Sequence, residues 1–240
     1  MGNKKSLLKI FRNIFGILFL VCVVLVVMEW YKYYSMRAHN NRINEQVIVQ
    51  KEETAVSVEA SADETDAKQQ NESDAIQYNF LPEINFEKLE EINEKCVGWI
   101  YACDGEISYP IVAAEDEFYL HHSIDGTESK AGAIFVNSSS ENPFEENRAV
   151  LYGHNMKDGS MFRPLLQYWQ EEEYLKQHPE IYIITKQKTY VYKVATAYVK
   201  EYQDIEFVTS TEQKENPVLD LITCEYSGKD TRLVVEAVLE

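Results

Sequence analysis

Residues 13–28 form an uncharged and almost wholly apolar run near the start of the chain. A bilayer span needs about 20 residues, and Trp30 with the tyrosines that follow it can extend the run at the membrane interface. Four basic residues precede the run and place the N-terminus in the cytoplasm: Lys4, Lys5, Lys9 and Arg12. The sequence therefore predicts a cytoplasmic basic tail over residues 1–12 and a single-pass transmembrane anchor over residues 13–34, with the rest of the chain extracytoplasmic.

A cleaved secretory signal is the alternative interpretation of this segment. Such a signal also begins with basic residues and an apolar core, but it ends in small residues of an A-x-A kind. Residues 28–34 read Met-Glu-Trp-Tyr-Lys-Tyr-Tyr and offer no such site. An uncleaved anchor is therefore favoured, both over the signal and over a buried helix of a soluble domain.

A strongly acidic region follows the anchor. The chain has a formal charge of −17 and residues 1–36 carry a net +4, so the other 204 residues carry −21. This charge argues against nucleic-acid binding, which needs a surplus of Lys and Arg. Residues 35–77 contain no aromatic residue, Gly or Pro and cannot bury much apolar surface. We expect a charged stalk over residues 35–79, disordered or loosely helical, and one folded domain over residues 80–240.

Short segments rich in Val, Ile, Tyr and Thr dominate the folded region. The expected strands are residues 97–101, 107–112, 133–136, 148–152, 181–185, 189–199, 218–226 and 232–239. A short helix capped by Asn85 should precede them, and a second should run from Pro164 to the residue before His178. The second helix should bury a stripe made of Leu165, Leu166 and Trp169. Seven or eight short strands predict a mainly β fold with flanking helices, closed or nearly closed as a barrel.

The common cofactor and metal motifs are absent from the sequence. No two glycines are separated by one residue, which excludes a dinucleotide fingerprint and a phosphate loop. There is no C-x-x-C pair and no H-E-x-x-H, so a zinc site is not expected. No regularly spaced carboxylates demand calcium, and His121-His122 is interpreted as a polar pair at a strand end. We expect no cofactor and no metal.

Three of the four cysteines lie outside the apolar run. Three is an odd number, so at least one thiol stays unpaired in a compartment that permits disulfides. Cys96 and Cys103 either pair or are both small core residues, and the second interpretation is favoured. Cys224 differs because of its neighbours.

Cys224 lies near the end of a strand that a short turn joins to the next strand. If residues 227–229 form a three-residue loop, Cys224 lies directly opposite Arg232, whereas a four-residue loop moves Arg232 off that face. A guanidinium beside a thiol stabilises the thiolate, and an imidazole can protonate a leaving group. His154, at the mouth of a strand, is the candidate partner; the alternative is a buried cysteine and a solvated loop histidine.

The sequence around these residues resembles the sortase family. The similar pieces are Leu-Tyr-Gly-His-Asn-Met-Lys-Asp-Gly-Ser-Met-Phe over residues 151–162, Ile-Thr-Cys-Glu-Tyr over residues 222–226, and Arg232. They occur in the family's order, and the similarity covers about residues 84–239; residues 153–162 look most like class B sortases. The resemblance implies an eight-stranded sortase β-barrel with flanking helices. It also implies a membrane-anchored cysteine transpeptidase on the outer surface of a Gram-positive bacterium.

By motif, the resemblance implies catalytic roles for three residues. Cys224 would be the nucleophile, His154 the general acid/base, and Arg232 the residue that orients the substrate and supports the oxyanion. The implied reaction cleaves an LPxTG-like or NPxTN-like sorting signal after Thr and passes the thioacyl group to an amine. The implied partners are surface proteins or pilins that carry the signal, with a peptidoglycan precursor or a pilin lysine as the acceptor.

Two departures from the class B pattern limit the resemblance. Asp220 stands at the first Thr of a Thr-Leu-x-Thr-Cys run, and the segment between Val199 and Val218 is shorter than the helix-bearing insertion of the class. Thr223 and Glu225 flank the nucleophile and are candidates for substrate binding, although on a strand they should point away from the Cys224 face.

Two other functions compete with the transpeptidase. One is an anchored cysteine peptidase that passes the acyl group to water; papain-like peptidases, however, place Cys before His in the chain, whereas His154 precedes Cys224 here. The other is a non-catalytic surface binding module with an inert Cys224.

Overall fold

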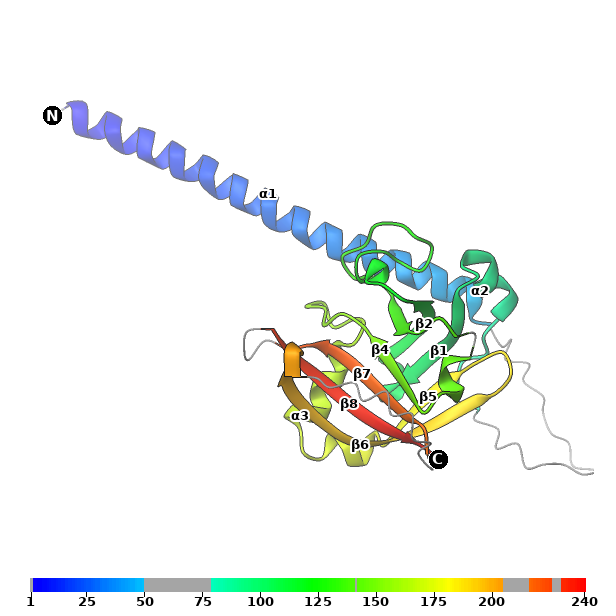
Figure 1. The fold of residues 1–240 in the computed structure, drawn as a ribbon. Coiled ribbons are helices and arrows are strands. Elements are labelled where there is room, and N and C mark those ends of the chain that lie inside the picture. The colour runs from blue at the N-terminus through cyan, green and yellow to red at the C-terminus, as the bar shows by residue number, and fades with distance from the viewer. Residues whose placement is uncertain (1, 50–78, 141, 205–215, 226–229) are drawn as a thin grey trace, which may run out of the picture.

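The computed structural model describes residues 2–49, 79–140, 142–204, 216–225 and 230–240. One long helix, α1 (Gly2–Val47), projects from a β-barrel that short helices flank (Figure 1). The strands in the described ranges are β1 (Cys96–Ala102), β2 (Ile107–Ala114), β3 (Ile134–Asn137), β4 (Arg148–Tyr152), β5 (Glu180–Ile184), β6 (Thr189–Glu201), β7 (Val218–Cys224) and β8 (Thr231–Leu239). The α-helices after α1 are α2 (Phe86–Ile92), α3 (Leu166–Gln170) and α4 (Tyr174–Gln177).

The eight strands close into a barrel in the order β1-β2-β3-β4-β7-β8-β6-β5, and β5 returns to pair with β1. The β2–β3 and β4–β7 pairs are parallel and the other pairs are antiparallel. Because adjacent parallel strands point the same way, the residues that end β4 and β7 lie at the same edge of the barrel. The closed eight-stranded barrel predicted from the sequence is confirmed.

Apolar side chains from all eight strands fill the barrel. They recur at every second residue, as with Ile181 and Ile183 on β5 or Leu219 and Leu221 on β7, because successive side chains of a strand point to opposite faces. A second apolar cluster lies outside the barrel, where α1 and α2 pack against it, and it includes the fully buried Trp99.

The short helices differ in how closely they follow the sequence. Asn85 caps α2 as expected, with its side chain accepting a hydrogen bond from Lys88 N at 3.0 Å. The helix expected after Pro164 is instead divided into a 3₁₀ turn (Arg163–Leu165), α3 and α4. Trp169 is 52% exposed, so its expected burial is wrong. Tyr168 is buried in its place because its hydroxyl can donate to His178 O at 2.7 Å.

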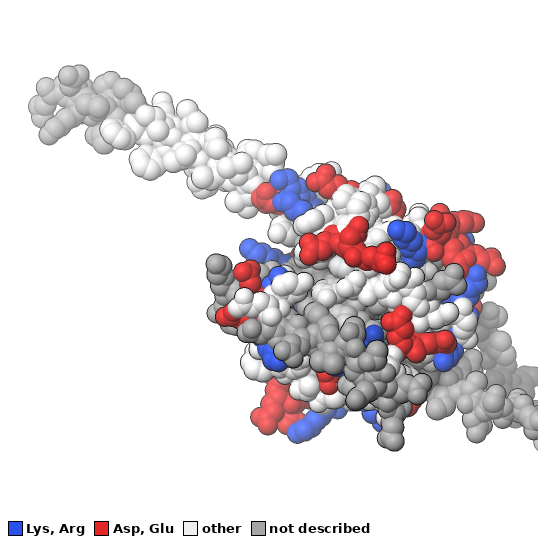
Figure 2. All heavy atoms as spheres, in the orientation of Figure 1, with Lys and Arg blue, Asp and Glu red and all other residues white. Residues whose placement is uncertain are grey.

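α1 continues unbroken from the expected anchor into the expected stalk. It contains a stretch apolar enough to cross a membrane by length and composition, and Figure 2 shows no charged side chain on the visible face of its described projecting part. Residues 35–47 of the expected stalk are helical, and they pack on the barrel, where Ile43 and Val47 are buried. These two residues lie one helical turn apart and therefore share a face. Residues 50–78 of the expected stalk lie outside the described residues.

The end of α1 is joined to the residues that precede α2. Asn85 N donates to Val47 O at 2.8 Å, and Val49 N donates to Glu83 O at 2.9 Å. Figure 1 accordingly shows α2 beside the C-terminal end of α1. The end of α1 and α2 thus form one layer on the outside of the barrel.

Candidate active site

A cleft of about 420 Å³ opens at the edge of the barrel where β4 and β7 end. His154, Cys224 and Arg232 all line it, although they come from three different elements. His154 follows β4 after Gly153, Cys224 ends β7, and Arg232 is the second residue of β8. The parallel pairing of β4 with β7 and the hairpin of β7 with β8 bring these three residues together.

Cys224 and Arg232 are direct partners across β7 and β8. The pairing continues beyond Cys224, since Glu225 N donates to Thr231 O at 3.0 Å. This register is the one that a three-residue loop over residues 227–229 predicts; residues 226–229, which include that loop, lie outside the described residues. The Arg232 guanidinium lies 5.1 Å from the centre of the Tyr202 ring, so a cation–π contact holds its charge at the cleft.

A main-chain carbonyl orients His154. Its Nε2 lies 2.7 Å from Leu120 O, and a carbonyl can only accept, so Nε2 carries a proton and Nδ1 is left to exchange one. Burial lowers the pKa of His154 below its ordinary value, the bond to Leu120 raises it, and the charges of His121 and Arg232 lower it, with a net decrease. The neutral ring is thus held in the Nε2–H tautomer, and the protonated ring loses the proton on Nδ1 more readily than an ordinary histidine does.

The loop after β4 is tied to the strand that carries the cysteine. Gly153 N donates to Ile222 O at 3.2 Å, and Asn155 Nδ2 donates to Cys224 O at 2.8 Å. Asn155 is 4% exposed, and its own oxygen accepts from Arg163 Nη1 at 3.1 Å. Sequence reasoning missed Asn155, although it directly follows the candidate histidine. These contacts fix the spacing between the backbones of His154 and Cys224.

Three acidic residues also line the cleft. Glu115, Asp116 and Glu117 follow β2, and all three are exposed. Among the described lining residues, Arg232 is the one with a permanently positive side chain. Sequence reasoning did not select this acidic run, although Glu-Asp-Glu directly after an expected strand was a visible signal.

Thr223 and Glu225 differ in their relation to the cleft. Thr223 lines it and is 2% exposed, and its hydroxyl has no hydrogen-bond partner among the described residues. Glu225 does not line the cleft; the Thr231 hydroxyl donates to Glu225 O at 2.6 Å. Thr223 therefore reaches the cleft wall in spite of its strand position, whereas Glu225 contacts the start of β8.

Asp220 belongs to a charged group remote from the cysteine. Arg148 Nη1 lies 3.0 Å from Asp220 Oδ2, and Arg148 Nη2 lies 2.9 Å from Glu236 Oε2, so the group joins β4, β7 and β8. Asp220 precedes Cys224 by four residues, which is about 13 Å along a strand. Asp220, which stands where class B sortases have threonine, thus takes part in an ion pair and does not contact the thiol.

The other described cysteines do not reach the cleft. Cys96 and Cys103 are buried and free, as the favoured interpretation had it. Burial raises the pKa of Cys96 to about 12 and that of Cys103 to about 11. Cys224 is half-exposed and lines the cleft. The ring of His122 stacks on Phe118 at 3.8 Å between centres, consistent with a structural role.

Comparison with known proteins gives a consistent result. A family profile described as the sortase domain matches residues 103–240. Sortase B from Listeria monocytogenes is 42% identical over 88 residues, which is 36% of this chain and 35% of the relative. Sortase B from Staphylococcus aureus is 26% identical over 174 residues, 60% of this chain and 70% of the relative. The match thus spans about a third of the first relative and more than two thirds of the second.

Solved structures give the same result over the barrel. Sortase B from B. anthracis in complex with AAEK1 is 32% identical, with a TM-score of 0.55 over 65% of this chain and 83% of that chain. A Staphylococcus aureus sortase B–substrate complex is 25% identical, with a TM-score of 0.57 over 65% of this chain and 84% of that chain.

Proposed function

The chain belongs to the sortase family and is most similar to its class B members, and on this basis we propose that it is a membrane-anchored cysteine transpeptidase that acts outside the cytoplasm. One observation carries the proposal: the barrel brings Cys224, His154 and Arg232 into one cleft. Only Cys224 among the described cysteines lines that cleft, and it is the direct strand partner of an arginine.

In the first half of the reaction the Cys224 thiolate attacks the threonine carbonyl of a bound sorting signal. The carbonyl oxygen becomes an oxyanion, which the positive charge of Arg232 stabilises. As the amide bond breaks, Nδ1–H of protonated His154 gives its proton to the departing amine. The products are a thioester on Cys224, the released C-terminal peptide and a neutral His154.

In the second half an incoming amine attacks the thioester. His154 Nδ1 takes the proton that the amine loses, and the C–S bond breaks to return the Cys224 thiolate. The Leu120 carbonyl holds the same ring nitrogen toward the cleft in both halves, because it occupies Nε2 throughout. A single oriented imidazole thus acts first as the acid and then as the base.

The proposed substrates are surface proteins or pilins with a C-terminal LPxTG-like or NPxTN-like signal, and the proposed acceptor is a peptidoglycan precursor or a pilin lysine. Thr223 lies in the cleft wall with its hydroxyl buried, so it would support the wall behind the bound signal. Glu225 would act less directly, through the start of β8.

The proposed arrangement in the membrane follows from α1. Residues 1–12 would lie in the cytoplasm of a Gram-positive bacterium and residues 13–34 would span the membrane, with the apolar run of α1 in the bilayer. The catalytic domain of residues 80–240 would lie outside, together with the part of α1 that packs on it.

Intact mass spectrometry tests the proposal. The full chain in mild detergent is mixed with LPxTG-like and NPxTN-like peptides, with and without an added amine, and Cys224→Ala is the control. We expect an acyl adduct on Cys224 that converts to an amine-linked product. Release of free acid in spite of the amine would indicate the peptidase instead. No adduct, with Cys224 alkylated no faster than in denatured protein, would indicate the binding module.

A further inference from the structure

The segment that carries Leu120 lies between α1 and the cleft. We call residues 118–133 the Leu120 loop. Its two limbs are hydrogen-bonded to each other, through Ala133 N to Tyr119 O at 2.9 Å and Ser129 N to His121 O at 2.8 Å. Ser123 N also donates to Thr127 O at 2.8 Å near the tip. The tip and the Leu120 limb are therefore parts of one braced unit.

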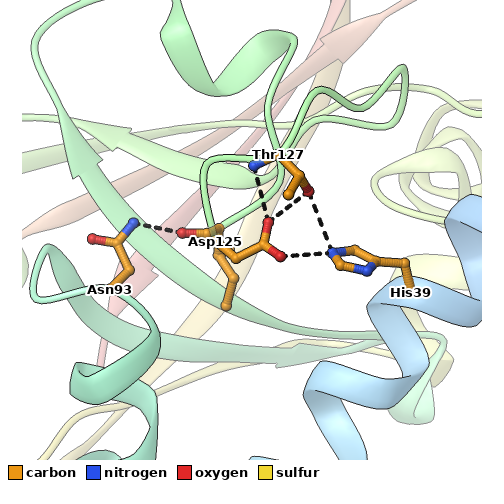
Figure 3. Close-up of polar contacts among 5 residues, drawn as sticks. His39, Asn93, Asp125 and Thr127 are labelled. Carbon is orange, nitrogen blue, oxygen red and sulfur yellow. Dashed lines mark hydrogen bonds and ion pairs between the residues drawn. The ribbon is translucent and has the colours of Figure 1, made fainter.

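α1 binds the tip of this loop. His39 Nε2 lies 3.0 Å from Asp125 Oδ2, and the hydroxyl of Thr127 lies 3.5 Å from the same nitrogen (Figure 3). Thr127 in turn donates to Asp125 Oδ1 from its main-chain nitrogen at 3.1 Å and its hydroxyl at 2.7 Å. Burial would raise the pKa of Asp125, but the bonds from Thr127 and the contact with His39 lower it overall, so the carboxylate is kept charged. A second, exposed contact joins Lys130 to Glu29 of α1 at 3.7 Å.

α2 holds the loop from another side. Asn93, which ends α2, donates from Nδ2 to Ile124 O at 2.6 Å and to the Tyr119 hydroxyl at 2.7 Å. Figure 3 shows Asn93 and His39 approaching the loop tip from opposite sides. The residues on either side of Leu120 in this loop are thus held by the layer that α1 and α2 form.

The returning limb of the loop passes close to the Leu120 carbonyl. Gly132 has φ +59°, and a Cβ there would lie 2.4 Å from Tyr119 O and 2.8 Å from Leu120 O. A cavity of about 20 Å³ lies where Gly132, Ile124 and Ile43 of α1 meet, which is room for about one water molecule. There is therefore little free space beside the loop, and a displacement of its tip should be transmitted to the Leu120 carbonyl.

We propose that α1, through His39 and its contact with Asp125, positions the catalytic histidine by fixing the Leu120 loop. His154 has a main-chain carbonyl as its orienting acceptor, and such an acceptor is only as fixed as the loop that carries it. His39 and Asp125 touch no reacting atom and are positioning residues. The juxtamembrane helix is then part of the active-site support as well as a tether. This inference rests on the proposed role of His154 as the general acid/base.

His39→Ala in the full chain, held in lipid nanodiscs, tests the inference. We expect kcat to fall about tenfold with KM nearly unchanged, since the ring of His154 loses its fixed orientation. The NMR titration of His154 should move to lower pH, because the Leu120 bond that raises its pKa is weakened. The chain has five histidines, so the signal is assigned by its loss in His154→Gln. His39→Gln keeps an N–H donor toward Asp125 and should restore both quantities.

Asn44→Ala is the matched control. Asn44 lies on the same part of α1, but its side chain donates to Ser108 O on β2 at 3.1 Å. It should leave the titration of His154 unchanged. The inference is overturned if His39→Ala and Asp125→Ala leave the titration of His154 unchanged, whatever happens to kcat, or if Asn44→Ala shifts the titration as much.

The titration needs no substrate, so the two proposals can fail separately. If no peptide reacts but His39→Ala shifts the titration of His154 and Asn44→Ala does not, the positioning role stands and the transpeptidase assignment fails. If peptides react but the titration does not respond to His39→Ala, the positioning role fails.

Discussion

Replacing Gly153 by alanine should displace His154 while leaving the barrel folded. A Cβ at Gly153 would lie 2.5 Å from Cδ1 of Ile134 and 2.7 Å from Cδ2 of Phe162. Ile134 is 1% exposed and Phe162 is 0% exposed, so neither side chain can move into solvent. The backbone at residue 153 must move instead, and it carries the next residue with it.

The distances set the size of the effect. Ordinary van der Waals contact begins at 3.4 Å, so the new methyl group and Ile134 must separate by the difference from 2.5 Å, about 0.9 Å. A misplacement of about 1 Å can cost about 10²-fold in rate, and overpacking a core costs about 1–3 kcal/mol. We therefore expect kcat/KM to fall about 10²-fold in a protein that still unfolds cooperatively.

Steady-state transpeptidation of the full chain measures kcat/KM, and thermal unfolding measures the remaining stability. Gly159→Ala is the control, because Gly159 lies in the same loop and nothing lies within 4 Å of its Cβ position. Its φ of +89° means that alanine there adds backbone strain alone, about 1–2 kcal/mol. The reasoning is refuted if Gly153→Ala keeps near-normal kcat/KM, or if Gly159→Ala loses as much.

Three further changes probe two contacts at the cleft and one ion pair remote from it. Asn155→Ala removes the bond to Cys224 O and should lower kcat about tenfold at little-changed KM; a change in KM alone in steady-state assays would contradict this. Arg148→Met removes the counter-charge of Asp220, which is 1% exposed, and should cost about 3–5 kcal/mol in urea unfolding. The double variant Arg148→Met/Asp220→Leu should recover most of that loss. If it does not, the loss does not come from a buried carboxylate without its counter-charge. Arg232→Ala should raise the pKa of His154 in an NMR titration, because the guanidinium charge lowers it; Lys200→Ala, on the neighbouring strand, is the control, and a downward shift for Arg232→Ala would be the wrong sign.

The barrel was predictable because its strands have simple local signals. β-Branched and aromatic residues alternate along them, and Gly and acidic turns separate them. The pairing of Cys224 with Arg232 was one of two registers that the sequence allowed, and the choice between them depended on turn length, since one residue more changes the face. These features depend on residues that lie close together in the sequence.

The docking of α1 on the barrel was not predicted, and the reason is physical. The average composition of residues 35–77 indicates a solvated segment, but a helix needs only a few apolar residues on one face to dock. Met36, Ile43 and Val47 supply that face. The interchange of Tyr168 and Trp169 likewise depended on a partner for the tyrosine hydroxyl, which the chain supplies only after folding.

The cleft was only partly predictable. Cys224, His154 and Arg232 have side-chain chemistry that a sequence displays directly. The partner of His154 is the main-chain carbonyl of Leu120, and every residue has such a carbonyl, so no residue type marks the one that is used. Tyr202 follows β6 and reaches Arg232 only through the strand order of the closed barrel.

α1 joins the apolar run to the barrel without a break. The direction in which the cleft faces, measured around the helix axis, is therefore set by the number of residues between the apolar run and the barrel. Each residue of an α-helix adds about 100° of rotation and about 1.5 Å of rise. One residue inserted between Trp30 and His39 would turn the barrel through about 100° about the helix axis and lift it by only about 1.5 Å. Seven inserted residues would return the barrel nearly to its original orientation about the helix axis, displaced by about 10 Å along that axis. If the apolar run spans a membrane, an acceptor held at the membrane surface would face either the cleft or the opposite side of the barrel. The number of residues between Trp30 and His39 would decide which.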